Sequence, residues 1–212
     1  MTGRGAGPTP QSVVRAGYDA IGERYHGWSH TTPTRLRMVD LVLGALQPGS
    51  VVVDLGCGPG DPATRRLCEA GHHVLGVDLS GEQLAIARRL APGATLVQAD
   101  VAEFALASES VDAVVSFYAT GHLPAAAHGP FYAAVAGWLR PGGLLLTSAP
   151  LSIGDDADDD WLGVPMFFGG VGVEATLAAV EDARLVVDSA EVVVEDESGG
   201  ERFLWVVARR PR

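Results

Sequence analysis

One short segment constrains the fold of this chain more than any other. The apolar run Val51–Leu55 has the length of a buried strand, and it leads directly into the glycine-rich loop Gly56–Gly60. Asp61 and Pro62 follow, a cap residue and a proline at a first helical position, so a helix is predicted to begin there. Glycines are needed where the backbone adopts unusual dihedral angles or approaches a ligand closely. The segment predicts one unit of a parallel sheet with a binding loop at its end.

The alternation of strand and helix continues along the chain. Each apolar run is nearly continuous, which is typical of parallel strands covered on both faces. Strands are predicted at Val51–Leu55, Val74–Leu79, Thr95–Gln98, Val111–Tyr118 and Leu144–Ser148. Helices are predicted at Gln11–Tyr25, Thr34–Leu46, Asp61–Ala70, Ser80–Leu90, Pro124–Leu139 and Val173–Asp182.

The C-terminal part departs from this alternation. Leu185–Val194 and Arg202–Ala208 flank the turn Glu197–Gly200, which predicts an antiparallel hairpin at the end of the sheet. We therefore predict an α/β, Rossmann-like single domain. It has a mostly parallel seven-stranded sheet with a C-terminal antiparallel hairpin, and helices on both faces.

The domain organisation follows from the same pattern. Residues 1–10 are rich in Gly and Pro and are predicted to form a flexible tail, and residues 11–212 a single domain with an N-terminal helical cap at 11–46. A lid-like insert is predicted at 153–172. Its acidic run Asp155–Asp160 is expected to be a solvated loop, with metal binding as the alternative. Its apolar half forms either the lid of a substrate pocket or a plug that anchors the loop; its large residues are Trp161, Met166, Phe167 and Phe168.

Composition excludes several kinds of partner. The 15 basic and 26 acidic residues give a net charge of −11, which disfavours nucleic acid and anionic membrane surfaces. No apolar run approaches the roughly 20 residues of a membrane-spanning helix. Two cysteines give no disulfide framework, so a cytoplasmic location is expected. All basic residues are Arg, which excludes lysine chemistry. With Lys and Asn both absent, a GC-rich bacterial source is expected.

An acidic residue follows the second predicted strand. Asp78 comes about 20 residues after the glycines, where a carboxylate can accept hydrogen bonds from both hydroxyls of a ribose. The alternative is that Asp78 caps the helix that begins near Ser80. The sixth position counted from Gly56 is Asp61 instead of glycine, and an acid there would repel a pyrophosphate. NAD and FAD are therefore disfavoured relative to a sulfonium cofactor, which has no phosphate.

These residues resemble a known family. The segment 53–60, Val-Asp-Leu-Gly-Cys-Gly-Pro-Gly, is similar to the S-adenosylmethionine (SAM) binding motif of class I methyltransferases, and the resemblance extends over roughly residues 15–148. Four further segments match the family in order and spacing: Val77–Ser80, Gln98–Val101, Val111–Ser116 and Leu139–Gly143.

The resemblance implies SAM as the cofactor and S-adenosylhomocysteine (SAH) as the product. It implies that Asp78 holds the ribose, that Asp100 contacts the adenine amino group, and that Asp54 organises the loop through backbone N–H groups. Leu79 and Val101 would flank the adenine. The full set of implied cofactor-binding residues is Asp54, Gly56, Cys57, Gly58, Gly60, Asp78, Leu79, Gln83, Asp100, Val101, Phe117 and Tyr25.

The segment Ser116–Pro124 lies where the methyl group is expected to point. It lacks the Asn/Asp-Pro-Pro-aromatic motif of amide methyltransferases, the chain lacks the acidic pair of metal-dependent catechol-type enzymes, and no metal ligands are assigned. His122 is the candidate general base, or else a hydrogen-bonded or capping histidine. Tyr18 and Tyr25 lie in a stretch that resembles the helix closing over SAM, and Tyr18 is a second candidate catalytic residue. Seven residues apart, the two tyrosines either line the pocket or pack on the core.

Together these features predict metal-independent methyl transfer to a small, partly apolar metabolite. Oxygen is the first guess for the acceptor atom, with nitrogen, sulfur and carbon left open. The expected partner is the small-molecule acceptor alone, without nucleic acid or membrane, and the chain is expected to be a monomer or homodimer. Two alternatives remain: a rearrangement or cyclisation on the same fold without methyl transfer, and a non-catalytic SAM-binding regulatory protein.

Overall fold

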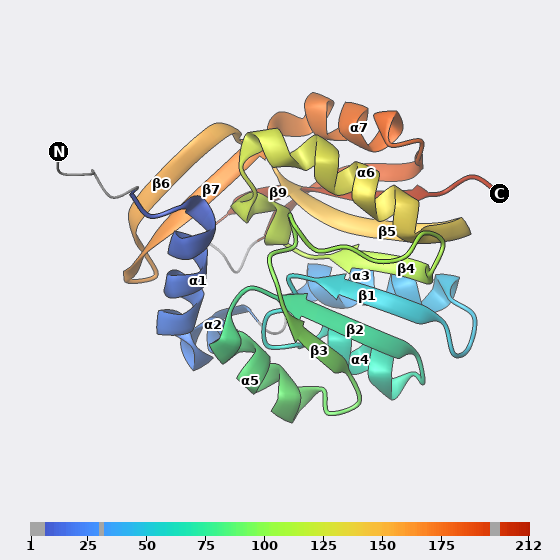
Figure 1. Cartoon of the computed structure of the whole chain (residues 1–212), viewed down its shortest axis with the longest axis horizontal. Helices are drawn as coiled ribbons and strands as arrows, with labels where there is room; N and C mark the ends of the chain where they lie inside the picture. The colour runs from blue at the N-terminus through green and yellow to red at the C-terminus, as the bar shows by residue number, and fades with distance from the viewer. Residues whose placement is uncertain (1–6, 30–31, 196–199) are drawn as a thin grey trace, which may run out of the picture.

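A single seven-stranded sheet organises the molecule, and its strand order is β3-β2-β1-β4-β5-β9-β8 (Figure 1). The computed structural model describes residues 7–29, 32–195 and 200–212. The first five strands in this order are parallel, and β9 is antiparallel to both β5 and β8. The predicted Rossmann-like α/β fold is confirmed. The strands are β1 (Val51–Leu55), β2 (His73–Asp78), β3 (Thr95–Gln98), β4 (Val111–Ser116), β5 (Leu139–Pro150), β8 (Val186–Glu195) and β9 (Glu201–Arg209).

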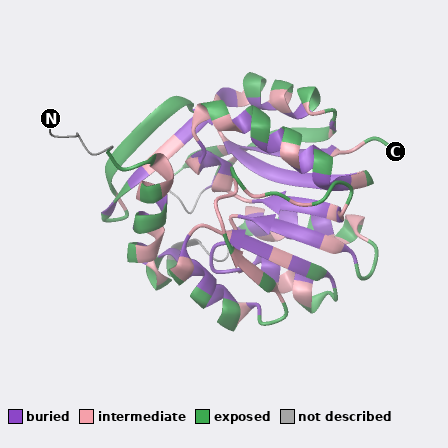
Figure 2. Cartoon of the chain, in the orientation of Figure 1, coloured by how far each residue is buried: buried purple, intermediate pink, exposed green. Residues whose placement is uncertain are grey.

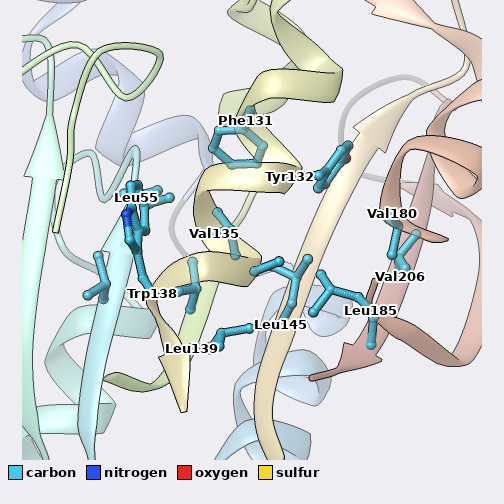
Figure 3. Close-up of a cluster of buried hydrophobic side chains, with 14 of the residues drawn as sticks. Leu55, Phe131, Tyr132, Val135, Trp138, Leu139, Leu145, Val180, Leu185 and Val206 are labelled. Atoms are coloured by element: carbon cyan, nitrogen blue, oxygen red, sulfur yellow. The ribbon is translucent and has the colours of Figure 1, made fainter. Parts of the chain in front are cut away.

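Helices cover both faces of this sheet because successive residues of each strand point to opposite sides. On one face, α6 (His128–Trp138) and α7 (Gly172–Asp182) pack against Val53, Leu55 and Leu145. Figure 3 shows this apolar layer, with side chains of both helices lying against those of the strands. On the other face, α3 (Pro33–Ala45) and α4 (Ala63–Glu69) bury residues such as Val52 and Leu146.

A separate layer lies beside the end of the sheet at which β1 and β2 terminate. Strands β6 (Ile153–Trp161) and β7 (Val164–Val171) form a two-stranded antiparallel sheet, against which α1 (Pro10–Ile21) packs (Figure 1). The contact is close: a Cβ built on Gly17 would lie 2.6 Å from the Cε atom of Met166. The short α2 (Glu23–Ser29) follows α1, and α5 (Gly81–Leu90) follows β2.

The structure corrects several of the predicted elements. The helix predicted from Asp61 begins at Ala63, and Asp61 does not cap it. The acidic run of the insert is the β-strand β6 instead of a loop, and its residues are almost all exposed (Figure 2). The helix predicted at Gln11–Tyr25 is interrupted at Gly22, which has a φ of +51°. The helix predicted from Pro124 begins at His128, because residues 125–127 form a 3₁₀ turn. Within the described ranges, no helix has the length and apolar character needed to cross a membrane.

Candidate active site

The glycine loop lies where strand order reverses between β1 and β4, the place at which α/β sheets bind ligands. Gly56, Gly58 and Gly60 all have positive φ angles, of +72°, +53° and +77°. The backbone N–H groups of Gly56 and Cys57 donate to the carbonyl of Val77 over 2.7 and 3.0 Å. These two bonds fasten the loop to the end of β2.

Gly56 leaves no room for a side chain. A Cβ built on it would lie 2.2 Å from the Cβ of Ala119, in the 3₁₀ turn that follows β4. Gly58 instead faces Tyr25, with its added Cβ 3.7 Å from the ring. At Gly56 the loop therefore packs closely against the turn that follows β4, whereas at Gly58 there is space between the loop and Tyr25.

The close approach at Gly56 predicts a measurable loss of stability in a Gly56→Ala variant. Gly49→Ala is a matched control, because Gly49 has almost the same φ of +74° and nothing within 4 Å of an added Cβ. Both variants carry the roughly 1–2 kcal/mol of left-handed strain. Gly56→Ala is expected to lose about 2 kcal/mol more, the magnitude of an overpacked contact. Urea unfolding checks this, and equal free energies of unfolding in the two variants would contradict the close contact.

The carboxylate of Asp78 contacts the glycine loop directly. Its Oδ2 atom accepts from the N–H of Gly58 and its Oδ1 atom from the N–H of Ser80, each over 2.8 Å. Burial raises its pKa to about 6, against the lowering effect of these backbone donors. A carboxylate oxygen has two lone pairs, so both oxygens retain acceptor capacity. The side chain that caps α5 is that of Ser80, which accepts from the N–H of Gln83.

A first cavity of about 80 Å³ is bounded by this loop, the ends of β2, β3 and β4, and the N-terminal helices. Eight of the residues predicted to bind the cofactor line it: Gly56, Gly58, Asp78, Leu79, Asp100, Val101, Phe117 and Tyr25. Both predicted catalytic residues, Tyr18 and His122, line it as well. The structure thus brings together residues from six separate segments of the chain.

Four predicted cofactor residues lie outside the lining of this cavity. Asp54 is buried behind the loop, where its Oδ2 atom accepts from the Thr64 hydroxyl over 2.6 Å, and burial raises its pKa to about 6. Cys57 is buried, and burial raises the pKa of its thiol. An added Cβ on Gly60 would lie 3.3 Å from α5. Gln83 donates to two carbonyls of the N-terminal region and so fastens α1 to α5.

The side chains of Tyr18 and His122 are joined by a hydrogen bond. The two side chains are 2.7 Å apart, from Oη to Nε2, and His122 Nδ1 is 2.8 Å from the carbonyl oxygen of Phe167. Because a carbonyl only accepts, Nδ1 carries the proton and Nε2 accepts from the Tyr18 hydroxyl. Burial lowers the pKa of His122 to about 4, so the imidazole is neutral at neutral pH.

A second cavity of about 560 Å³ adjoins the first. Four aromatic residues line both cavities and form the wall between them: Tyr18, Tyr25, Tyr118 and His122. Trp161 and Phe168 of the β6–β7 hairpin line the second cavity, whereas Met166 is fully buried against α1. The apolar half of the insert therefore contributes both to a cavity wall and to the packing that anchors the hairpin.

Three residues of the second cavity were missed by sequence reasoning. Arg35 shares the buried face of α3 with Met38 and Val42, and this helical spacing is the signal that could have identified it. Tyr118 follows β4 with a φ of +65°, and its hydroxyl donates to Glu195 over 2.8 Å. No local signal connects two residues that lie 77 positions apart.

The lining of the first cavity fits the cofactor that the motifs imply. Its carboxylates, Asp78 and Asp100, suit hydroxyl and amino groups and would repel phosphates. Leu79 and Val101 supply apolar surface for a base. A side chain at Gly58 would project toward Tyr25, into the space between loop and helix. In the described part of the chain, no group of three His, Cys, Asp or Glu residues is arranged to hold a metal ion.

Comparisons with known proteins agree with this geometry. Residues 52–143 match the family model described as a methyltransferase domain. The chain is 31% identical over 179 residues to a 27-O-demethylrifamycin SV methyltransferase of Amycolatopsis mediterranei, covering 71% of this chain and 65% of that protein. It is 37% identical over 107 residues to a trans-aconitate 2-methyltransferase of Azoarcus, covering 50% and 41%.

A solved structure is similar over most of its length. The crystal structure of an S-adenosylmethionine dependent methyltransferase from Mesorhizobium loti has a TM-score of 0.67 and 27% identity, and the match covers 82% of this chain and 98% of that one. The chain spans less than half the length of the sterol and trans-aconitate methyltransferases that it matches.

Proposed function

The chain belongs to the class I, S-adenosylmethionine-dependent methyltransferases, and from this we propose that it transfers a methyl group to a small, partly apolar molecule. One observation carries the proposal: the cavity that fits the cofactor and the larger second cavity share a wall of four aromatic residues. An acceptor in the second cavity is therefore next to the first. The names of its rifamycin and trans-aconitate relatives, which denote small-molecule acceptors, support the same class of substrate.

When bound, SAM supplies an electrophilic methyl group on a sulfonium. We propose that Asp78 accepts from the ribose hydroxyls and Asp100 from the adenine amino group, with Leu79 and Val101 on the faces of the ring. The loop glycines allow the backbone to approach the methionine part. Asp54, behind the loop, accepts from the Thr64 hydroxyl and so links the end of β1 to α4, the helix that follows the loop.

The Tyr18–His122 pair handles the proton of the acceptor. With SAM bound as the methyl donor, an O–H acceptor that takes the methyl group would lose its proton to Tyr18. Tyr18 passes its own proton to His122 Nε2, to which it is already bonded. The carbonyl of Phe167 holds the imidazole in the required tautomer. We propose this metal-independent route with oxygen as the acceptor atom.

The N-terminal helices and the β6–β7 hairpin together form the cap of the proposed site. The first cavity, at about 80 Å³, is smaller than the roughly 300–1,000 Å³ of typical ligand pockets. Tyr18 and Tyr25 narrow it from the side of α1 and α2, and Gly22 separates these two helices. We expect the helices to shift outward when the cofactor binds.

The raised pKa of Asp78 predicts that cofactor affinity depends on pH. The ionised carboxylate is the form that accepts from ribose, and it becomes the minor form as the pH falls below about 6. SAH is expected to bind about tenfold more weakly at pH 5 than at pH 7.5. Calorimetric titrations at both pH values measure the ratio. An Asp78→Asn variant should lose this dependence; if it retains the full tenfold, the titrating group is another one, such as Asp54.

Transfer of an isotope-labelled methyl group tests the proposal. The protein is incubated with methyl-labelled SAM and an extract of the producing cell, and small molecules, protein and nucleic acid are separated before counting. Label is expected in the small-molecule fraction, and not in a parallel incubation with the Asp78→Asn variant. Label in protein or nucleic acid would contradict the proposed substrate class. Tight SAH binding with no label in any fraction would favour a non-methylating reaction or a regulatory role.

A further inference from the structure

A buried guanidinium at the second cavity lacks a carboxylate partner. Arg35 lies in the first turn of α3 and is 8% exposed. Among the residues that the structure describes, no carboxylate oxygen lies within 4.0 Å of its nitrogens, and its buried Nε has no hydrogen-bond partner. A buried charge is unfavourable unless it is paired and hydrogen-bonded. The described part of the protein supplies no ion pair for this side chain and leaves its Nε without a hydrogen bond, although Nη2 donates to the Tyr25 hydroxyl.

The surroundings of Arg35 hold the guanidinium in place without neutralising it. Its Cζ atom lies 4.3 Å from the centroid of the Tyr118 ring, and its Nη2 atom is 3.4 Å from the Tyr25 hydroxyl. Tyr118 is itself fixed, because its N–H donates to Ser148 and its hydroxyl donates to Glu195. A ring face attracts a cation weakly compared with a carboxylate. These contacts fix the position of a guanidinium that belongs to the lining of the second cavity.

Arg35 lines the second cavity and does not line the first. We propose that the acceptor molecule carries a carboxylate, and that this carboxylate binds to the guanidinium of Arg35. The inference rests on the proposed function, because it assigns the second cavity to the acceptor. The planar fork of arginine matches a carboxylate through two parallel hydrogen bonds.

The other charges of the cavity give the acceptor a direction. Four acidic residues also line it: Asp156, Asp158, Glu195 and Glu201. These carboxylates disfavour an anion, whereas Arg35 and the exposed Arg202 are the two arginines of the lining that attract one. Since Arg35 is the buried one of the two, a carboxylate placed there leaves the rest of the acceptor beside the wall that contains Tyr18 and His122.

The test compares carboxylates with uncharged amides of the same shape. The probes are trans-cinnamate with trans-cinnamamide and 2-naphthoate with 2-naphthamide, titrated by calorimetry into the SAH-saturated protein. In the wild type at least one carboxylate is expected to bind tenfold or more tightly than its amide. In Arg35→Met the difference is expected to fall within twofold, and Arg35→Lys should keep part of it. Arg37→Met is the matched control, because Arg37 lies on the same helix but outside both cavities, paired with Glu191.

Two further measurements, the melting temperature and the affinity for SAH, distinguish a ligand-binding role of Arg35 from a structural one. Arg35→Met is expected to melt at the same temperature as the wild type or higher, since it removes an unpaired buried charge, whereas a structural arginine would lower the melting temperature. Its affinity for SAH should stay within twofold. A tenfold loss of SAH affinity would overturn the proposal by assigning Arg35 to the carboxylate of the cofactor.

Two other outcomes distinguish a failure of the carboxylate inference from a failure of the proposed function. If neither carboxylate is preferred over its amide in the wild type, whether both bind alike or neither binds, the carboxylate inference is wrong while the proposed function stands. If the wild type does not bind SAH at all, the proposed function fails, and this inference fails with it.

Discussion

An Asp78→Asn variant is expected to bind SAH about 100-fold more weakly than the wild-type protein. Asp78 already accepts from Gly58 and Ser80, and its remaining lone pairs are those proposed to receive the ribose. Asparagine replaces one carboxylate oxygen by an NH2 group, which donates hydrogen bonds and cannot accept them. This NH2 group would then face another donor, either a backbone N–H or a ribose hydroxyl. The loss of charge-assisted hydrogen bonds amounts to about 3 kcal/mol, which is about 100-fold in affinity. Calorimetric titration with SAH measures it.

Asp112→Asn is the matched control for this variant. Asp112 also accepts from a backbone N–H, that of Val51, and from Arg140, but it lies outside both cavities. Its variant is expected to keep wild-type affinity for SAH. Asp78→Asn binding within twofold of the wild type, with unchanged melting temperature, would show that this carboxylate does not hold the cofactor.

A His122→Asn variant is expected to lower the rate of methyl transfer by at least about 100-fold, the usual contribution of a general base. Asparagine keeps a donor near the position of Nδ1 and so preserves the bond to Phe167, but it has no counterpart of Nε2. Tyr18→Phe should lower the rate similarly, because it removes the hydroxyl that is bonded to Nε2. The measurement is the initial rate of label transfer from SAM into the small-molecule fraction, with SAH affinity measured in parallel.

The two readouts distinguish catalysis from binding. We expect SAH affinity to stay within about threefold in both variants, since neither residue supplies a polar group to the ribose or adenine. His73→Ala, at the exposed start of β2, is the control and should keep the wild-type rate. Transfer at the wild-type rate by His122→Asn would contradict the proposed base and leave His122 a packing residue.

Local sequence signals predicted the central sheet well. The bounds of β1 and β3 agree with the predicted runs, because both have apolar residues at their centre and both are preceded by a Pro-Gly turn. The β6–β7 hairpin was not predictable in this way. Aspartate has low strand propensity, and β6 is a strand because its backbone pairs with β7, whose apolar residues pack on α1. That information lies in tertiary contacts and not in the acidic run itself.

In the candidate site, too, the parts built from contiguous sequence were predictable and the parts built from distant segments were not. The cofactor side follows from motifs that are contiguous in sequence, from the glycine loop to Asp78 and Asp100. The acceptor side is assembled from distant segments, as in the pair of Tyr18 and His122, 104 residues apart, and the bond from Tyr118 to Glu195. Sequence reasoning left His122 open between a base and a structural histidine. The geometry gives it the partners that a base needs, and its catalytic role stays a prediction.

The most direct test of the proposed arrangement of cofactor and acceptor is a structure of the protein co-crystallised with SAH. We predict that the nucleoside lies in the first cavity, with the ribose hydroxyls on Asp78 and the sulfur facing the wall of four aromatic residues, toward the second cavity. SAH bound elsewhere, or with its sulfur directed away from that wall, would contradict the proposal that a methyl group passes from one cavity to the other.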